Sequence, residues 1–245
     1  MGCIVALYSI LAMPILHNRA NLCLFTLVLY LLTGCTDSTV TDRPTPSTVA
    51  HNSDAPTFKI LILGDSLTEG YDVPPSNAYP FLLEKKLNSQ SQKNSRIYQV
   101  INGGVTGSTT SGGASRIEWY LKSPPDFLIV ALGGNDGLRG IPPSESKENL
   151  SNIILRAQAK KVPVLLAGMK LPPNYGFQYI KDFENMFPQL AEELNVPLLP
   201  FLLEGVGGNP KMNLPDRIHP NSSGHQIICQ TVYEHLTKYL SKNLP

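Results

Sequence analysis

The sequence predicts an α/β protein whose parallel sheet is covered by helices on both faces. Two observations support this prediction. Short runs of consecutive apolar residues, which suit strands buried on both faces of a sheet, alternate with segments that carry apolar residues at helical spacing. The first three runs also lead into glycine-bearing segments, as expected where parallel strands meet the ligand-binding edge of an open α/β sheet.

The expected strands are short and strongly apolar. The first reads Ile60 to Leu63 without a polar residue and stops at Gly64, which is typical of a strand with no solvent-facing side. The others are shorter or more mixed, but each is bounded by a turn or helix signal. We expect strands at residues 60–63, 98–101, 127–132, 162–169 and 196–199.

The expected helices lie between these strands and after the last one, at residues 78–88, 114–121, 144–161, 183–194 and 223–240. Pro80 fits the first turn of the first helix, whereas Pro124 and Pro125 stop the second. No internal repeat is present, so a single domain follows. The last helix should turn one apolar face inward, formed by Ile227, Ile228, Val232, Leu236 and either Tyr239 or Leu240.

Composition excludes several classes of function. The chain has 245 residues, a formal charge of +1 and no basic run, so it lacks the electrostatic footprint of a nucleic-acid-binding protein. No zinc-type Cys/His spacing, Walker loop or G-x-G-x-x-G motif follows an expected strand. We therefore expect neither a metal nor a cofactor.

Residues 1–35 are expected to form a signal peptide. Their single charge, Arg19, precedes an apolar run at residues 22–32, which is short for a membrane span but suits a signal. The ending Leu32-Thr33-Gly34-Cys35 is similar to the lipobox of bacterial lipoprotein signals, in which the cysteine is lipidated. We therefore expect Cys35 to anchor the protein at the periplasmic side of the cell envelope. An uncleaved anchor and ordinary secretory cleavage, giving a soluble periplasmic or secreted protein, are the alternatives.

Two further features accompany this segment. Residues 1–12 are unusually apolar for the leading region of a signal, so we hypothesise that translation starts at Met13. Residues 36–57 are rich in Ser, Thr and Pro and are expected to be a flexible tether to a domain at residues 58–245. That domain contains a single cysteine, Cys229, which is expected to be a buried small apolar residue.

Ser66 is the first candidate for chemistry, because it follows the first expected strand directly after Gly64 and Asp65. Open α/β sheets place their ligands at this end of a strand. A serine here is either a nucleophile or the N-cap of a following helix. The choice depends on whether a base and oxyanion donors occur elsewhere.

His219 is the candidate base, because a serine hydroxyl is too weak a nucleophile alone. It lies in a polar, proline-marked loop at residues 216–221, and the three-residue separation lets Asp216 reach its Nδ1 atom. This contact would leave Nε2 facing Ser66. A surface salt bridge or a metal-ligand pair is the alternative for Asp216 and His219. The other histidines beyond the signal region lie in the tether or in the last helix: His51, His225 and His235.

Candidate oxyanion donors follow three successive strands. Ser66 N–H lies at a helix start, Gly107 lets a backbone N–H approach a ligand closely, and Asn135 offers a side-chain amide. Ordinary turn geometry for the glycine and an Asx turn for Asn135 are the alternatives. Parallel strands bring all these residues to one edge of the sheet, together with Asp216 and His219.

Four blocks of the sequence, in order, resemble the GDSL/SGNH hydrolase family: Gly64-Asp65-Ser66-Leu67, Gly107, Gly133-Gly134-Asn135-Asp136 and Asp216-x-x-His219. The resemblance covers roughly residues 59–240. It implies a flavodoxin-like three-layer α/β/α sandwich with a five-stranded parallel sheet. It also implies a serine hydrolase with Ser66, Asp216 and His219 as catalytic residues and Ser66, Gly107 and Asn135 as oxyanion hole, without metal or cofactor.

Residues 132–140, 171–176 and 196–201 are similar to a bacterial periplasmic subgroup of this family. That similarity implies hydrolysis of aryl and acyl esters, fatty acyl thioesters and lysophospholipids, with Leu138, Pro173 and Tyr175 in the substrate pocket. The chain departs from the subgroup at Ser108, where Asp is usual, so hydrogen bonding around the oxyanion loop should differ. A carbohydrate O-deacetylase and a non-catalytic flavodoxin-like binding module are the alternative functions.

Overall fold

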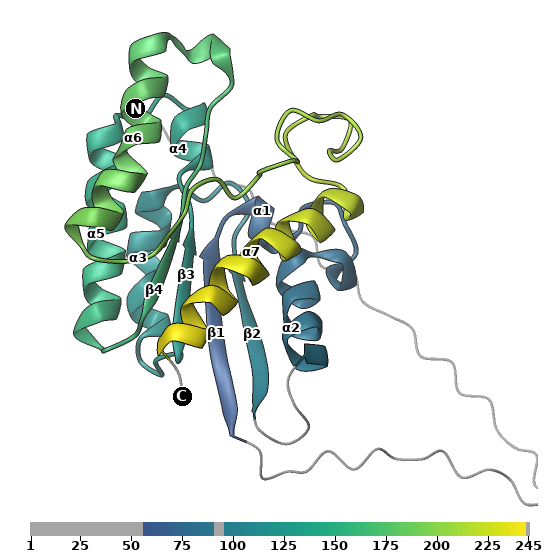
Figure 1. Cartoon of the computed structure of the whole chain (residues 1–245). Helices are drawn as coiled ribbons and strands as arrows, with labels where there is room; N and C mark the ends of the chain where they lie inside the picture. Colours follow the sequence, from purple (N-terminus) through teal and green to yellow (C-terminus); the bar gives the residue numbers. More distant parts are fainter. Residues whose placement is uncertain (1–55, 91–95, 244–245) are drawn as a thin grey trace, which may run out of the picture. The chain divides into compact units, whose positions relative to one another are not determined.

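The computed structural model describes residues 56–90 and 96–243 (Figure 1). The expected signal peptide, the Met13 start, the lipidation site Cys35 and nearly all of the tether lie outside these residues. Thr57, the last residue of the expected tether, already belongs to the first strand.

The sheet has five parallel strands in the order β2-β1-β3-β4-β5, which confirms the expected α/β class. Gly64 at the end of β1 pairs with Gly104 of β2 and Ala131 of β3, so these three strands end at the same level. The strands are β1 (Thr57–Gly64), β2 (Ile97–Gly104), β3 (Phe127–Ala131), β4 (Val164–Ala167) and β5 (Leu198–Leu199).

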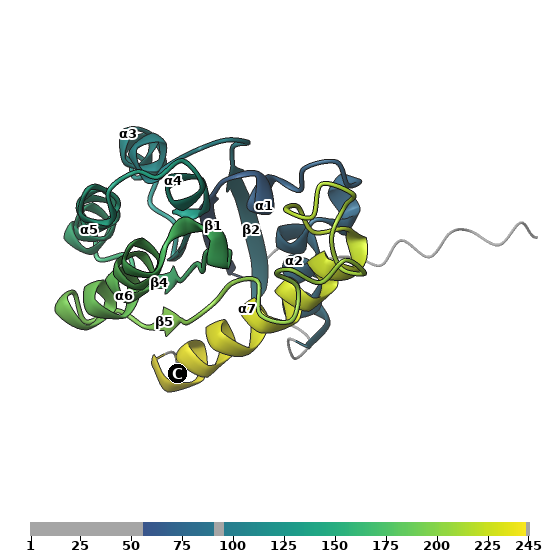
Figure 2. The same cartoon turned by 90° about the horizontal axis from the view of Figure 1, so that it is seen from above.

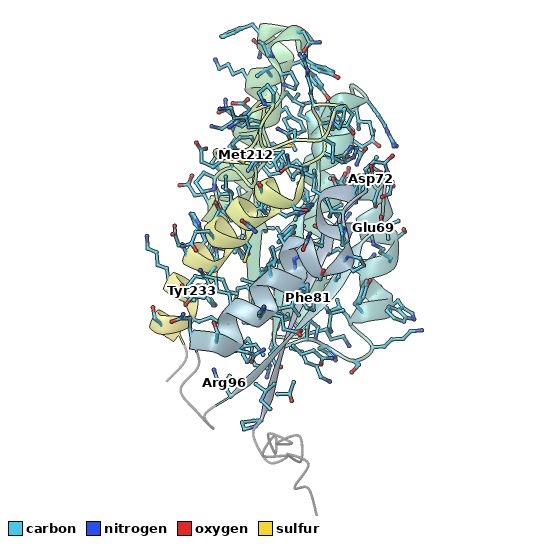
Figure 3. All side chains as sticks on the ribbon, turned by 90° about the vertical axis from the view of Figure 1, so that its right-hand side faces the viewer. Glu69, Asp72, Phe81, Arg96, Met212 and Tyr233 are labelled. Carbon is cyan, nitrogen blue, oxygen red and sulfur yellow. The ribbon has the colours of Figure 1, made fainter. Side chains whose placement is uncertain are left out.

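Helices cover both faces of the sheet, as Figures 1 and 2 show. One face carries α2 (Tyr79–Gln90) and α7 (Ser222–Asn243), and the other carries α3 (Thr110–Tyr120), α5 (Pro143–Ala159) and α6 (Phe177–Glu193). Figure 3 shows α2 and α7 side by side, with Phe81 and Tyr233 labelled on them. The Lys86 ammonium lies 5.0 Å from the centre of the Tyr233 ring and links the two helices. Two shorter helices, α1 (Ser66–Glu69) and α4 (Gly134–Leu138), follow β1 and β3 directly.

The central strands form the core of the domain. Ile60 to Leu63 are at most 1% exposed, and every residue of β3 is fully buried. Burying one such aliphatic side chain stabilises a fold by about 1.5–3 kcal/mol, so the ends of β1 and β3 are firmly held. The inner face expected for α7 is confirmed by Ile228, Val232, Leu236 and Leu240, and Cys229 is buried as expected. Within the described part of the chain, no helix is long and apolar enough to cross a membrane.

Several element boundaries differ from the expected ones. Helix α3 begins at Thr110, four residues earlier than expected, because Thr109 caps it by accepting a hydrogen bond from Gly112 N–H. Gly113 is required inside this helix, since a Cβ there would lie 2.3 Å from Leu132. Helix α6 begins at Phe177 instead of 183 with largely exposed residues, which gave no apolar periodicity to detect.

Candidate active site

Ser66 is the first residue of α1, and the side chain that caps this helix belongs to Asp65. Oδ1 of Asp65 accepts a hydrogen bond of 3.0 Å from Leu67 N–H. The alternative in which Ser66 is merely an N-cap is therefore wrong, and its hydroxyl is available for another contact. Gly64 makes this tight strand-to-helix turn possible, because a Cβ there would lie 2.0 Å from the Thr68 hydroxyl.

The structure brings Ser66, His219 and Asp216 together in one hydrogen-bonded row. Nε2 of His219 lies 3.0 Å from Ser66 Oγ, and Nδ1 of the same ring lies 2.6 Å from Asp216 Oδ2. The other carboxylate oxygen of Asp216 accepts hydrogen bonds from the backbone N–H groups of Ile218 and His219, at 2.9 and 3.0 Å. The loop thus holds Asp216 rigidly against the histidine, in the arrangement that lets a histidine accept the proton of a serine.

These contacts keep Asp216 ionised. Partial burial acts to raise the pKa of Asp216, but the hydrogen bonds from the His219 ring, His219 N–H and Ile218 N–H outweigh it and lower the pKa to about 2. An ionised carboxylate favours the Nδ1–H tautomer of the neutral ring and stabilises the ring once it is protonated.

Tyr71 supports the other side of the histidine. Its ring centre lies 4.4 Å from that of His219, with 33° between the ring planes. The tyrosine is 44% exposed and follows α1 in the loop after the nucleophile. Tyr71 could not be predicted from the sequence, because an isolated aromatic residue in a loop carries no motif.

The expected oxyanion donors lie on the loops after β1, β2 and β3. Gly107 has a φ of +74°, a backbone conformation that favours glycine, and Arg139 fixes its peptide by donating from Nη2 to the Gly107 carbonyl at 2.9 Å. Within the described residues, neither Ser66 N–H nor Gly107 N–H donates a hydrogen bond to another group. Both are therefore available to a developing negative charge.

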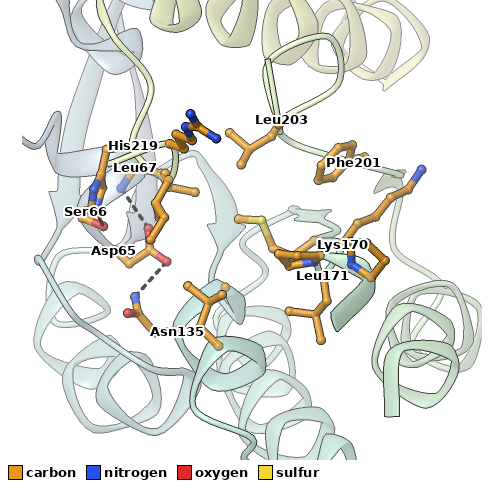
Figure 4. Close-up of a pocket in the computed structure, with 18 residues that line it drawn as sticks. Asp65, Ser66, Leu67, Asn135, Lys170, Leu171, Phe201, Leu203 and His219 are labelled. Carbon is orange, nitrogen blue, oxygen red and sulfur yellow. Dashed lines mark hydrogen bonds between the residues drawn. The ribbon is translucent and has the colours of Figure 1, made fainter. Parts of the chain in front are cut away.

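Asn135 lies in α4, and its side-chain amide does not form the Asx turn considered above. Its Nδ2 atom donates to the Ser108 carbonyl at 3.1 Å and to Asp65 Oδ2 at 3.3 Å. These bonds join the loops that follow β1, β2 and β3 at a single atom. Figure 4 shows the amide pointing toward Asp65, the residue directly before Ser66.

Asp65 is a buried carboxylate next to the candidate nucleophile, with 1% of its surface exposed. Burial raises its pKa to about 6, although the hydrogen bonds from Leu67 N–H and Asn135 and the electrostatic interaction with His219 act in the opposite direction. Asp65 belongs to the motif Gly64-Asp65-Ser66-Leu67, and its position directly before Ser66 was the signal that could have identified it. The motif alone did not indicate that this carboxylate caps α1 and bonds to Asn135.

The loop after β2 contains Ser108, the residue expected to change the hydrogen bonding around Gly107. The hydroxyl of Ser108 accepts a hydrogen bond of 2.5 Å from Arg116 Nη1, while Arg116 Nη2 donates to the Gly64 carbonyl at 2.5 Å. Arg116 Nε is buried and has no hydrogen-bond partner among the described residues. Partial burial lowers the pKa of this arginine. Arg116 therefore links Gly64 at the end of β1 to the loop after β2, where its acceptor is the neutral hydroxyl of Ser108.

A cleft of about 670 Å³ opens from Ser66 along the edge of the sheet. Figure 4 shows Ser66 and His219 on one side, with Lys170 and Phe201 on the opposite side. Half of the residues that line it have apolar side chains: Leu67, Leu138, Met169, Leu171, Pro172, Pro173, Phe201, Leu203 and Ile218.

Two of the three residues expected in the pocket, Leu138 and Pro173, line this cleft. Tyr175 is not among the described residues that line it, which corrects the prediction. Its hydroxyl donates instead to the Leu138 carbonyl at 3.2 Å, so it supports a residue that lines the cleft. Gly107 and Asp216 also do not line the cleft. Gly107 lies in the loop after β2, and Asp216 lies behind His219, bonded to its Nδ1 atom.

Comparison with known proteins gives a consistent result. The model of the GDSL-like Lipase/Acylhydrolase family matches residues 62–227. An arylesterase from Vibrio mimicus is 38% identical over 74% of this chain and 90% of its own length. The thioesterase 1/protease 1/lysophospholipase L1 of Escherichia coli K12 is 38% identical over 72% of this chain and 82% of its own length.

Solved structures agree with these sequence matches. The psychrotrophic esterase EstA from Pseudoalteromonas sp., in a structure inhibited by monoethylphosphonate, superimposes with a TM-score of 0.69 and 30% identity. That match covers 75% of this chain and 98% of the esterase. Both the sequence and the fold are therefore similar to those of ester-cleaving enzymes.

Proposed function

The chain belongs to the GDSL-like lipase/acylhydrolase family and is a hydrolase, and from this premise we propose that it cleaves carboxylic esters and thioesters through an acyl-enzyme on Ser66. The observation that carries the proposal is the row of hydrogen bonds from Ser66 Oγ through His219 to Asp216, at 3.0 and 2.6 Å.

In the proposed first step, His219 Nε2 takes the proton of the Ser66 hydroxyl while Oγ attacks the carbonyl carbon of the ester. The imidazolium that forms is stabilised by the ionised Asp216. The tetrahedral intermediate then collapses, and the alcohol or thiol leaves with the proton from His219. Water repeats the sequence on the acyl-enzyme, which releases the acid and restores Ser66.

We propose that Ser66 N–H, Gly107 N–H and the Asn135 amide hold the oxyanion of this intermediate. The two backbone donors have no acceptor among the described residues, and the first of them lies at the amino end of α1, which favours negative charge. The bond from Asn135 to Asp65 is long at 3.3 Å, so that hydrogen can turn to an oxyanion at little cost.

The proposed substrates are aryl and acyl esters, fatty acyl thioesters and lysophospholipids. An apolar cleft that opens at Ser66 suits an acyl chain, and relatives carry the names arylesterase and thioesterase 1/protease 1/lysophospholipase L1. A carbohydrate O-deacetylase would need a more polar lining. An acetylated sugar tested against a medium-chain ester separates the two functions, since the apolar cleft should favour the ester.

We also propose a place of action at the periplasmic side of the bacterial envelope, through a lipid on Cys35. This rests on the apolar run at residues 22–32 and the Leu32-Thr33-Gly34-Cys35 ending. Cytoplasmic acyl-CoA would then be out of reach, so membrane-derived lysophospholipid is the proposed physiological substrate. Lysophospholipid turnover should fall in a deletion strain, and unchanged turnover would count against the proposal. Replacing Cys35 with Ser should release the protein from the membrane fraction.

A hydrolysis panel tests the proposed activity. Esters and thioesters of increasing acyl length are offered to the native enzyme and to Ser66→Ala, whose folded state is checked by circular dichroism. The native enzyme should hydrolyse medium-chain members, and Ser66→Ala should lose roughly 10³-fold or more in kcat. Equal activity of the two proteins would reject the proposed nucleophile.

A further inference from the structure

Arg217 has a backbone conformation that is unfavourable for its side chain. Its φ is +62°, in the left-handed region that glycine tolerates and arginine does not. Three other described residues share this conformation: Lys161 and Asn195 each follow directly on the last turn of a helix, where a left-handed residue is common, and Asp72, in the loop after α1, is of a residue type that often adopts it. Arg217 instead lies in the loop between Asp216 and His219. Glycine would make the same turn without strain, so the side chain needs another explanation.

The Arg217 side chain lines the cleft together with its neighbours Ile218 and His219. Within residues 56–90 and 96–243, it forms no ion pair and no side-chain hydrogen bond. Asp216, the carboxylate next to it in sequence, is engaged by His219 and two backbone N–H groups. The cleft thus presents an exposed guanidinium without a protein partner.

The charges of the other lining residues do not compensate Arg217. Lys170 is a second cation, on the side of the cleft opposite Ser66 (Figure 4). Among the described lining residues, Asp65 is the only carboxylate, and it is 1% exposed and bonded to Leu67 N–H and Asn135. The open part of the cleft therefore has apolar walls and two exposed positive charges, on Arg217 and Lys170.

The position of Arg217 indicates which part of a substrate it meets. In the proposed mechanism His219 gives its proton to the departing alcohol or thiol, so this portion of the ester must pass beside His219. Arg217 lies two residues away on the same loop. The acyl portion, by contrast, belongs against the apolar walls.

We propose that Arg217 recognises an anionic group, a phosphate or carboxylate, carried by the alcohol or thiol portion of the ester. The enzyme should then favour anionic esters over neutral ones with the same acyl chain. This inference rests on the proposed esterase function and adds a specificity-determining residue to it. A guanidinium binds phosphate and carboxylate through two parallel hydrogen bonds, which explains an arginine in this strained position.

The test compares kcat/KM for two matched pairs of soluble substrates at low ionic strength. One pair is 1-hexanoylglycerol 3-phosphate and 1-hexanoylglycerol; the other is the hexanoyl esters of 4-hydroxybenzoate and 4-hydroxybenzamide. The phosphate pair tests the charge of a lipid-like headgroup, and the aryl pair tests whether any anion suffices. For each protein, the ratio of anionic to neutral kcat/KM is the readout, and comparing this ratio between proteins cancels the difference in intrinsic reactivity of the two substrates.

The variants are Arg217→Gly, Arg217→Gln and Arg217→Lys, with Lys161→Gly as the matched control. Lys161 has a φ of +60°, is exposed and lies at the end of α5, outside the cleft, so its replacement relieves the same strain without touching the site. An exposed charge contact is worth up to about fivefold, and a bidentate arginine contact more. We therefore expect the ratio to fall at least about fivefold in the Gly and Gln variants, to fall less in the Lys variant and to stay unchanged in the control.

Salt and thermal melting provide independent readouts. The ratio of the native enzyme should fall in about 0.5 M salt, which screens exposed charges, whereas that of Arg217→Gly should not change. The Tm of Arg217→Gly should be equal to or above that of the native enzyme, because glycine adopts a positive φ without strain. A ratio that is the same in the native enzyme and Arg217→Gly would overturn the role of Arg217. If the native enzyme hydrolyses no ester at all, the proposed function fails, and this inference with it.

Discussion

Nε2 of His219 lies 3.0 Å from Oγ of Ser66, although 153 residues separate them in the sequence. The sheet explains this contact. Ser66 follows β1, an inner strand between β2 and β3, and the long segment after β5 returns over the same edge before α7 begins. The Asp216 carboxylate holds the His219 ring in place through the Nδ1 atom, which faces away from Ser66. The predictions below test what each neighbour of this pair contributes.

Asn135→Ala should lower kcat by roughly 10²–10³-fold, because it removes a preorganised donor to the oxyanion. Steady-state kinetics with an aryl ester measure this change. The two loops that Asn135 ties at Ser108 and Asp65 will also loosen, so a thermal melt must show that the variant is folded. A loss of kcat below about threefold would remove Asn135 from the oxyanion hole.

Tyr71→Ala should reduce kcat/KM severalfold, because the ring that packs 4.4 Å from His219 is lost and the imidazole can leave its position opposite Ser66. Tyr71→Phe keeps the ring and should keep most of the activity. Since the tyrosine is 44% exposed, neither change should lower Tm by more than a few degrees. Equal activity of the alanine and native enzymes would show that the stacking has no effect on the base.

Ser108→Ala should destabilise the domain by about 1–3 kcal/mol, because it leaves Nη1 of the partly buried Arg116 guanidinium without an acceptor, next to an Nε that already has none among the described residues. Ser108→Asp should instead offer this cation a carboxylate and raise stability. Urea denaturation of the three proteins measures both effects. If the Asp variant were the least stable of the three, a carboxylate at position 108 would not stabilise the Arg116 guanidinium.

Asp65→Asn should change the pH dependence of stability. The folded-state pKa of about 6 lies above the unfolded value of 3.8, so the folded protein keeps a proton between pH 4 and 6 that the unfolded chain releases. Stability therefore falls as the pH rises through this range, and the full cost of roughly 3 kcal/mol is present above about pH 6. The variant should be more stable than the native protein at pH 7–8 and similar at pH 4.

A second buried group makes this test sharper. Burial lowers the pKa of His225 to about 4, below the unfolded value of 6.5, so its effect is the reverse: stability is lost as the pH falls from 6.5 to 4. In the native protein the two slopes oppose each other, and in Asp65→Asn the acid-side loss should stand alone. Urea denaturation at intervals from pH 4 to 8 measures it. A difference between the two proteins that does not vary with pH would contradict the assignment to Asp65.

Local patterns predicted the sheet and the contact between Asp216 and His219, whereas the full row from Ser66 to Asp216 also needed the resemblance to the GDSL/SGNH family. Four apolar residues ending at Gly64 indicate a buried strand, and the spacing of Asp216 and His219 determines which carboxylate can reach the ring. The contacts of Tyr71, Arg139 and Arg116 could not be predicted in this way. Each depends on how separate loops meet in space, and the positive φ of Arg217 is likewise a property of the folded loop.

Element boundaries and the role of Tyr175 were less predictable for a similar reason. Thr109 starts α3 through a cap to a glycine, and the first turn of α6 is largely exposed, so neither start carries an apolar repeat. Tyr175 is apolar enough for a substrate pocket, but its hydroxyl bonds to the Leu138 carbonyl and the residue does not line the cleft. Residue type alone does not reveal whether a ring faces a cleft.

The most direct test of the account is a mass measurement after treatment with an aryl alkylphosphonate, which transfers its phosphonyl group to an activated serine. The native protein should gain the mass of one adduct, peptide mapping should place it on Ser66, and esterase activity should fall in proportion to the adduct. Ser66→Ala should gain no mass. Loss of activity with Ser66 unmodified, or the same adduct on Ser66→Ala, would contradict the claim that Ser66 is the nucleophile.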